Sequence, residues 1–287
     1  MRRRLFWSLF ALVPALAVTL AVSPASAGST PARVSLNERA AAAALAALRR
    51  LPLGHMTNQR APGHTRQIRG LNQAGSYNWA GYVDDNSTGN TYRKVTGQWS
   101  EPAVTCGQED QIVIFFVGID GWNSSTVEQA GTFAQCYQGA AHYYSWWEMY
   151  PATPITIVGS TVAAGDKIAA SVVKTGTSYT LAVNDSTNTA NTFTKTQTCA
   201  ATTCLAASAD WIAEAPSGAR GDYPLPDFKT WTLTNATVRS GTTLGKISTF
   251  PDDEITMFDS SATYPLVQPG PLNATGNVFS DAWKNSY

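Results

Sequence analysis

The sequence predicts one all-β domain, a sandwich or a barrel, that begins near Tyr77. From Tyr77 onward the composition shifts to Thr, Ser, Val, Gly and aromatic residues. Short runs of alternating apolar and polar residues recur about every ten positions between turn residues, which is typical of strands. No stretch of this region has a convincing helical period. About two hundred residues of this kind predict one domain rather than two.

The candidate strands are short and are bounded by turn residues. Successive side chains of a strand point to opposite faces, so each segment also predicts which of its residues lie together. The segments are 111–119, 143–150, 155–158, 167–174, 179–184, 192–198, 210–214, 231–238 and 245–249. We find no internal repeat.

The first 27 residues have the three parts of a cleavable signal peptide. Residues 2–4 are basic, residues 5–22 are apolar, and residues 25–27 form a small-residue cleavage site. The apolar stretch is interrupted by proline and ends at that site, so a retained membrane anchor is the weaker interpretation. The sequence therefore predicts a secreted, extracellular protein, and we expect no membrane partner.

Residues 28–74 predict a basic pro-segment that is removed during maturation, which leaves residues 75–287 as the mature domain. Within the segment, residues 35–51 are rich in Ala and Leu and begin with a capping box, which predicts a helix that Pro52 ends. Residues 54–75 are polar and basic and predict an exposed linker, with cleavage between about residue 70 and residue 76. The alternative is an N-terminal tail without a role.

Charge is distributed unevenly, although the formal net charge of the chain is zero. The first 74 residues contain ten of the 20 basic residues and one of the 20 acidic residues, which leaves residues 75–287 at about −9. This domain lacks the basic patch that nucleic acid or an anionic membrane requires, so we expect neither as a partner. Its composition suits acidic surroundings, in which protonation removes the repulsion between carboxylates.

All four cysteines lie in the predicted mature domain. An exported protein meets oxidising conditions, so two disulfides are expected. Cys199 with Cys204 would close a local loop, and Cys106 would then pair with Cys136. Four cysteines allow three pairings, so this pairing is a preference. A nucleophilic thiol would need an unpaired cysteine and is not expected.

Several catalytic chemistries lack their residues. Two of the three histidines lie in the basic segment, so His142 alone remains in the mature domain. No Gly-x-Ser-x-Gly elbow accompanies it, which argues against a serine or cysteine triad. Paired cysteines leave zinc without thiolate ligands, and the acidic runs 84–86 and 252–254 are more typical of solvated turns than of calcium sites. No phosphate-binding Gly loop is present, and we expect no metal and no cofactor.

The candidate strand 143–150 places an acid among aromatic residues. Alternation puts Tyr144, Trp146, Glu148 and Tyr150 on one face. Such a face is expected of a binding groove for an extended polymer. A core stripe with Glu148 at its open end is an equal alternative.

Other carboxyl and amide groups lie near strand ends. Glu214 is expected on the same face as Asp210, beside apolar side chains that would raise its pKa and suit it to proton transfer. By spacing alone, a strand-end Glu before an Ala-Pro pair is more often simply exposed. Asp120, Glu128 and Gln129 follow a hydrophobic strand, at positions that either carry function or merely turn the chain.

Six short segments together resemble the glutamic peptidases, also called eqolisins. Each is weak alone, but they occur in the family order and with plausible spacing over most of residues 78–216. The segments are 78–81 (NWAG), 116–121 (FVGIDG), 128–131 (EQAG), 146–151 (WWEMYP), 163–166 (AAGD) and 209–216 (ADWIAEAP). The resemblance implies a concanavalin A-like β-sandwich of two antiparallel sheets, with substrate lying across the concave face.

The resemblance also implies an acid endopeptidase that pepstatin does not inhibit, with Gln129 and Glu214 as the catalytic pair. Glu214 would take a proton from the attacking water, and Gln129 would hold that water and stabilise the oxyanion. The residues that would line the cleft are Trp79, Phe116, Asp120, Trp146, Glu148 and Tyr150.

The chain departs from the fungal pattern of this family at three positions. Phe116 replaces a Trp, which keeps an apolar wall but removes an indole donor. Ala130 replaces a Thr, and Phe133 stands where the fungal members have Asp. The last change removes a carboxylate expected near the catalytic pair, which bears on the pKa of Glu214 and on substrate preference.

Two alternatives use the same sandwich. A glycoside hydrolase would use Glu148 and Glu214 as its two carboxyls and would give Gln129 no role. A carbohydrate-binding module would use Trp146 and Trp147 as platforms for sugar rings.

The expected partners are protein or peptide substrates and the chain's own pro-segment. We expect the protein to be a monomer. Residues 28–74 carry about +6, so they would be attracted to the acidic domain at neutral pH. Acid would weaken that attraction. This predicts a zymogen whose processing depends on pH.

Overall fold

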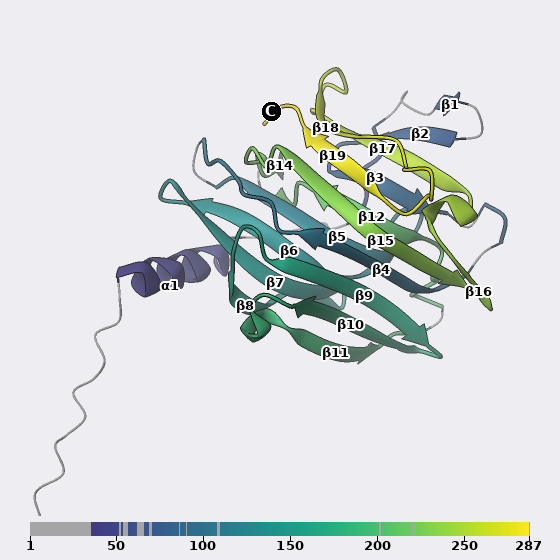
Figure 1. Ribbon diagram of the computed structural model, residues 1–287, viewed down its shortest axis with the longest axis horizontal. Helices are drawn as coiled ribbons and strands as arrows, with labels where there is room; N and C mark the ends of the chain where they lie inside the picture. The colour runs from purple at the N-terminus through teal and green to yellow at the C-terminus, as the bar shows by residue number, and fades with distance from the viewer. Residues whose placement is uncertain are drawn as a thin grey trace, which may run out of the picture. The chain divides into compact units, whose positions relative to one another are not determined.

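Seventeen of the described strands form one hydrogen-bonded sheet, which folds into two packed layers that we call the first and the second sheet, and two short strands pair separately (Figure 1). The structure is a computed structural model that describes residues 36–51, 53, 57–61, 66–68, 71–85, 87–89, 91–107, 110–200, 202–219 and 221–286. The predicted signal peptide, residues 1–27, lies outside the described residues.

The first sheet carries the candidate site, and the second packs behind it. The strands of the first sheet, each paired with the next one named, are β8 (Thr153–Val162), β7 (Ala140–Tyr150), β6 (Val127–Tyr137), β5 (Ile112–Asp120), β12 (Ala209–Glu214), β3 (Trp79–Asp84), β17 (Asp252–Phe258), β18 (Pro265–Pro269) and β19 (Phe279–Trp283). The second contains β11 (Phe193–Thr198), β10 (Ser178–Asp185), β9 (Lys167–Thr175), β4 (Tyr92–Ser100), β15 (Thr230–Ser240) and β16 (Thr243–Gly245).

Strand β15 joins the two sheets. Its residues 230–233 pair with β19 and its residues 234–240 pair with β4, so the hydrogen-bonded ladder continues from one sheet to the other. Pairing between these strands is antiparallel throughout. The all-β antiparallel sandwich expected from the sequence is confirmed.

The main core lies between the sheets. On β5 the side chains of Val113, Phe115 and Val117 point into it, as the alternation of a strand requires. Phe115 stacks on Trp231 of β15 with ring centroids 5.1 Å apart and an interplanar angle of 23°. Burying each large apolar side chain stabilises the fold by about 1.5–3 kcal/mol, so this interface holds the two sheets together.

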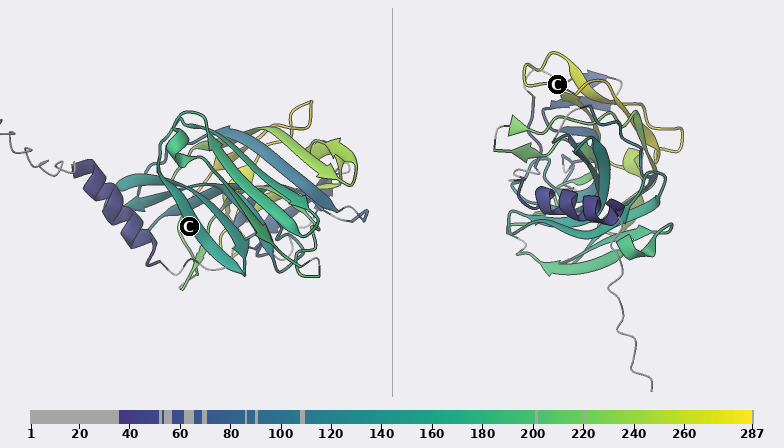
Figure 2. Two further views of the ribbon diagram at one scale, coloured as in Figure 1. Left: turned by 90° about the horizontal axis from the view of Figure 1, so that it is seen from below. Right: turned by 90° about the vertical axis from the view of Figure 1, so that its left-hand side faces the viewer.

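The other face of the first sheet is also covered. Its apolar side chains include Ile114 and Phe116, and the segment that precedes the sandwich packs against the same cluster. Helix α1 (Leu36–Leu48) contributes Leu48, which is 2% exposed, and Figure 2 shows α1 lying across one end of the strands. Strand β5 is therefore buried along its whole length on both faces.

Most predicted elements are present. The helix expected over residues 35–51 is α1, and it ends before Pro52 as expected. Eight of the nine candidate strands correspond to β5, β7, β8, β9, β10, β11, β12 and β15. The ninth prediction, residues 245–249, is wrong: β16 ends at Gly245, and a 3-10 helix (Ile247–Thr249) follows, closed by a bond from the Lys246 N–H to Thr249 Oγ1 of 2.8 Å.

The linker predicted over residues 54–75 contains strands. β1 (Arg66–Ile68) pairs with β2 (Leu71–Ser76), and β2 pairs in parallel with β17. Arg60 also bridges to Ser76, and Ala61 is buried. The prediction of an exposed linker failed because these polar residues take their backbone partners from distant strands, which leaves no local pattern.

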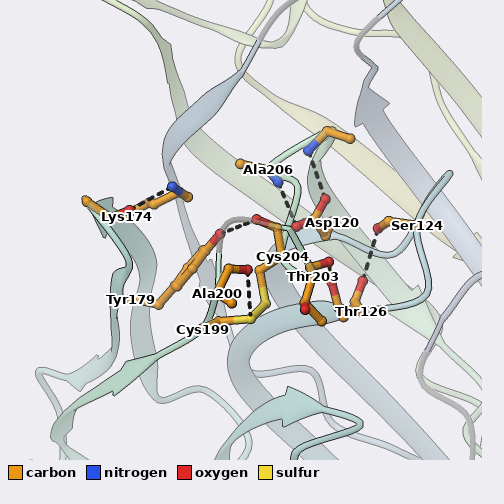
Figure 3. Close-up of a disulfide and its surroundings, with 12 residues drawn as sticks. Asp120, Ser124, Thr126, Lys174, Tyr179, Cys199, Ala200, Thr203, Cys204 and Ala206 are labelled. Carbon is orange, nitrogen blue, oxygen red and sulfur yellow. Dashed lines mark hydrogen bonds between the residues drawn. A yellow bond between two sulfur atoms is a disulfide. The ribbon is translucent and has the colours of Figure 1, made fainter.

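Both preferred disulfides are present. Cys106–Cys136 ties the loop before β5 to the end of β6, and Cys199–Cys204 closes a short loop beside Tyr179 (Figure 3). Within the part of the chain that the structure describes, no helix is long and apolar enough to cross a membrane.

Candidate active site

Gln129 and Glu214 lie on strands that flank β5 on its two sides. Gln129 on β6 pairs with Gly118, and Glu214 on β12 pairs with Ile114. These positions share the face that carries Phe116 and Ile212, away from the second sheet. The sheet register therefore places on one face two side chains that are 85 positions apart in the sequence, opposite positions of β5 that lie four residues apart.

Gln129 is oriented by Glu148. The two residues are cross-strand partners, and Gln129 Nε2 donates to Glu148 Oε2 at 2.7 Å. Both side chains are buried, and Gln129 Oε1 has no hydrogen-bond partner within the described structure. Burial raises the pKa of Glu148 to about 8, although the bonds from Gln129 and from the Ile155 backbone lower it in part. The Nε2 of this amide is thus held by Glu148, and its Oε1 is left able to accept a hydrogen bond from a ligand.

Glu214 is a buried carboxyl with one open oxygen. Asn78 Nδ2 donates to its Oε1 at 3.3 Å, whereas its Oε2 has no partner within the described residues. Burial raises the pKa of Glu214 well above its usual value, and the charge of Glu148 raises it further. The polar groups of Trp79 and Asn78 lower it in part. An ionised Glu148 therefore makes Glu214 harder to ionise.

Aromatic side chains form the walls around these polar groups. The ring of Phe116 lies between those of Trp79 and Trp146, with centroids 5.6 Å and 6.2 Å away, both in edge-on arrangements. All three are fully buried, and Tyr150 packs at the margin of the same cluster. Five of the six residues expected to line a cleft, all except Asp120, therefore belong to one face.

Asp120 lies elsewhere. It has a positive φ of 70° at the end of β5, so the strand alternation does not continue through it. Its carboxylate accepts from the backbone N–H groups of Ala206 and Ala207, each at 2.8 Å, beside the Cys199–Cys204 disulfide (Figure 3). The Asp120 carboxylate therefore holds this loop.

The tryptophan platform for sugar rings is contradicted. Trp146 and Trp147 are neighbours on β7 and point to opposite faces of the sheet. Trp147 is 5% exposed and lies in the core between the sheets. Two rings on opposite faces cannot form one binding platform.

Two residues near the site were not predicted to belong to it. Asn78 was noticed only as part of a motif, and it donates to Glu214. Asp210 lies beside Gln129: a Cβ atom at Gly118 would be 3.3 Å from Asp210 Oδ2 and 3.5 Å from the Gln129 Cβ. The alternation of strand 209–214 already put Asp210 on this face, which was the available signal.

The site contains other carboxyl groups although Phe133 stands where the fungal members have Asp. Its ring packs on Tyr144 with centroids 4.9 Å apart, which extends the apolar wall. Asp210 and Glu148 flank Gln129 on its two sides and supply acidic groups instead. Burial raises the pKa of Asp210 well above its usual value.

Residues 57–61, which we call the covering segment, lie over this site. Asn78 Nδ2 donates to the Thr57 carbonyl at 3.0 Å as well as to Glu214. The Gln59 N–H donates to Asn78 Oδ1 at 2.7 Å, and the Gln59 carbonyl accepts from the Tyr77 N–H at 2.7 Å. At its other end, the guanidinium of Arg60 lies over Trp122, 4.6 Å from the ring centroid. The segment thus contacts the same amide that serves the candidate base.

The chain belongs to the Peptidase A4 family, whose model matches residues 77–263. This confirms the resemblance to the glutamic peptidases, and family membership makes the protein an enzyme of peptide-bond hydrolysis. Aspergillopepsin-2 of Aspergillus niger is 29% identical over 205 residues, which cover 63% of this chain and 72% of that protein.

Solved structures of the family share the fold. Scytalido-glutamic peptidase, solved with a peptide-based transition state analog, superimposes with a TM-score of 0.60 at 18% identity, covering 72% of this chain and 98% of that one. SCP-B, an eqolisin solved with the tripeptide Ala-Ile-His, gives a TM-score of 0.57 at 18% identity over the same shares. Aspergilloglutamic peptidase from Aspergillus niger gives 0.51 at 21% identity, covering 61% of this chain and 99% of that one.

Proposed function

We propose that this protein is a secreted acid endopeptidase in which Glu214 and Gln129 act on a water molecule. The observation that carries the proposal is the pair of open polar atoms, Glu214 Oε2 and Gln129 Oε1, on one aromatic-walled face of the sheet. Buried polar atoms without partners are costly, by about 1–3 kcal/mol each, and are retained where a ligand completes them.

The proposed reaction needs no group beyond water and the peptide. Ionised Glu214 takes one proton as the water oxygen bonds to the scissile carbonyl carbon, whose oxygen becomes the oxyanion. The Gln129 amide holds the water, and an N–H of that amide stabilises the oxyanion. Glu214 then gives its proton to the leaving nitrogen as the C–N bond breaks, which restores the carboxylate.

Acid conditions suit this pair of carboxyls. Glu148 at a pKa of about 8 is protonated in acid, which removes the charge that disfavours ionisation of Glu214. Opening of the site to water also lowers the pKa of Glu214 towards its ordinary range, because burial is the largest cause of its shift. We expect the active enzyme to lose activity towards neutral pH as Glu148 ionises.

We propose further that residues 1–27 are a signal peptide and residues 28–74 an inhibitory pro-segment. The contacts of the covering segment with Asn78 support this, because they occupy the space beside Glu214 that a substrate backbone would need. Helix α1 adds an apolar contact: Leu48 packs near Ile155 and Ile157 of β8. Inhibition here is exclusion of substrate from the site.

The experiment compares wild type with three variants on a denatured protein substrate over pH 2–8, with and without pepstatin. Glu214→Gln should lower kcat/KM by at least ~10³-fold, and Gln129→Ala by ~10²–10³-fold, because they remove the base and the oxyanion donor. Glu128→Gln is the matched control: it changes a buried carboxyl adjacent to Gln129 whose neighbours are Asp120 and the disulfide loop. Full activity of Glu214→Gln would falsify the assignment.

The glycoside hydrolase alternative makes an opposite prediction. It needs Glu148 and Glu214 as its two carboxyls, but Glu148 accepts a bond from Gln129, and the family is one of peptidases. Incubation of the same preparations with soluble polysaccharides should release no reducing ends. Sugar release that Glu214→Gln abolishes would replace the peptidase proposal.

A further inference from the structure

The side chain of Gln59 occupies a polar recess next to the candidate site. Its Nε2 donates to Ser217 Oγ at 2.7 Å and to Asp222 Oδ1 at 3.2 Å. Both hydrogens of this amide nitrogen therefore have a protein acceptor. The remaining polar groups of Gln59 on the backbone are bonded to Asn78 and Tyr77.

The two oxygens of the recess come from the predicted mature domain and are bonded to one another. Ser217 lies in β13 (Ser217–Gly218) and pairs with Asp222 in β14 (Gly221–Asp222). Ser217 Oγ donates to Asp222 Oδ1 at 2.6 Å, and Ser217 is 7% exposed. The Tyr223 N–H bonds to the Pro216 carbonyl at 2.9 Å and closes the hairpin.

The hairpin also depends on Gly218. A Cβ atom at this position would lie 2.7 Å from the ring of Tyr223, a distance at which one of the two must move. Tyr223 in turn packs against the apolar cluster of the site face. The two oxygens of the recess are thus held at a fixed place relative to the site.

The recess lies within reach of a substrate backbone at Glu214. Asn78 links the two places, since its Nδ2 serves both Glu214 and the Thr57 carbonyl while its Oδ1 accepts from Gln59. The charge of Asp222 also raises the pKa of Glu214, so the two carboxyls interact through space. A peptide bound with one carbonyl on Asn78 would place the side chain two residues further on in the recess, as Thr57 and Gln59 do.

We propose that, once the covering segment has left, Ser217 and Asp222 form a specificity subsite for a substrate residue whose side chain ends in a primary amide, with Gln59 as its occupant in the precursor. This inference rests on the proposed peptidase function. A glutamine in this subsite gives both amide hydrogens an acceptor. A methionine of similar length leaves Ser217 and Asp222 buried beneath it without that partner, and such a site discriminates against the ligand that lacks the polar group.

A glutamate side chain should also be disfavoured. Its carboxyl offers at most one hydrogen where the recess presents two acceptors, and when ionised it is repelled by Asp222. The three residues therefore rank glutamine first, then methionine and glutamate. The ranking separates an amide subsite from a merely roomy pocket, which would accept all three alike.

The test uses the full-length chain, activated in acid, with loss of the N-terminal segment followed by mass spectrometry. Substrates are peptides that differ at one residue, with Gln, Met or Glu placed in turn at each of the positions on either side of the cleaved bond. At one position we expect kcat/KM for Gln to exceed that for Met by about tenfold, the size expected of two added hydrogen bonds. The ratio of two substrates on one enzyme cancels any change in the chemistry of Glu214.

The Ser217→Ala/Asp222→Ala variant should bring that ratio to about one, whatever its absolute kcat/KM. Ser261→Ala/Asp259→Ala is the matched control, because Ser261 Oγ donates to Asp259 Oδ2 at 2.6 Å in an exposed turn, and it should keep the wild-type ratio. A wild-type ratio near one at every position, or a ratio that survives in Ser217→Ala/Asp222→Ala, overturns the subsite while leaving the peptidase intact. Absence of all proteolysis overturns both.

Discussion

Two buried carboxyls on the inner face of the first sheet contrast with Glu214 on its outer face. Towards the second sheet, Asp120 has a backbone N–H on each carboxylate oxygen, and Glu101 Oε2 accepts from Thr132 Oγ1 at 2.5 Å and from Trp99 Nε1 at 3.2 Å. On the outer face, Glu214 Oε2 and Gln129 Oε1 have no partner within the described residues, and towards the inner face the same is true of Glu101 Oε1 and of both Glu128 oxygens. Bonds that the fold completes stabilise it, whereas the two unpartnered atoms of the outer face lie among the aromatic side chains of the candidate site. The predictions below test this contrast.

The largest expected effect is on the inner face. Asp120→Ala leaves the N–H groups of Ala206 and Ala207 without acceptors in a buried loop, so we expect a loss of about 4 kcal/mol in the free energy of unfolding. Urea unfolding at pH 4 measures it, and the folded fraction should keep its peptidase activity. Asp120→Asn retains one acceptor oxygen and should lose about half as much. Normal stability with lost activity would reverse the assignment of Asp120.

The second prediction concerns Glu101, whose pKa burial raises to about 7, against the bonds from Thr132 and Trp99 that lower it. A carboxyl with a raised folded-state pKa contributes no penalty below its unfolded value near 4.5, and stability is lost as pH rises from there to about 7. The loss is on the order of 3 kcal/mol. Glu101→Gln should remove it, so the variant should exceed wild type in melting temperature at pH 8 but not at pH 4. Equal differences at both pH values would contradict the explanation.

The third prediction concerns the bond between Gln129 and Glu148 on the outer face. Glu148→Ala releases the amide of Gln129, and we expect kcat to fall by about 10²-fold, since the oxyanion donor is no longer held. The loss of activity towards neutral pH should also move to higher pH, because Glu148, which ionises at a pKa of about 8, is no longer there to raise the pKa of Glu214. Glu148→Gln, which keeps an acceptor for Gln129, should recover much of kcat. Loss of activity with an unmoved neutral limb and no recovery would indicate a purely structural role.

The smallest expected effect concerns removal of the pro-segment. Attraction between the basic segment and the acidic domain is screened by salt, so 0.5 M NaCl should speed processing by about two- to fivefold at constant pH. Acid has a second effect that opposes release of the segment. Burial under the covering segment raises the pKa values of Glu214 and Asp222, so protonation of these two carboxyls favours the covered state. Electrophoresis of the precursor over time follows both. A processing rate that does not change with salt would show that attraction between the basic segment and the acidic domain does not control removal.

The sequence predicted the elements with local signals better than those with distant partners. Helix α1 and most strands follow from composition and alternation, and the face of Glu214 follows from its place in β12. Asp120 was assigned to the cleft by the family resemblance, and its contact with the loop at residues 206–207 lies 86 positions away, so no local pattern predicted it. Ser217 and Asp222 carried no signal at all, because their role depends on Gln59, more than 150 positions away.

Trp146 and Trp147 show that strand alternation predicts placement better than composition does. Composition suggested a pair of exposed rings, while alternation along β7 already required them to face opposite ways. The period of the strand was the stronger argument. Composition says which residues a protein has, and periodicity says which of them can act together.

Strand β2 has a consequence for how a mature enzyme stays dispersed. Its residues 72–76 pair in parallel with residues 253–257 of β17, so part of the chain that precedes the domain seals a sheet edge. A cut after Ser76 would free that edge, and an unpaired edge is a template for strands of neighbouring molecules. A cut before Leu71 would leave the edge closed. If the proposed pro-segment is removed, the position of the cut would thus set whether the product is colloidally stable.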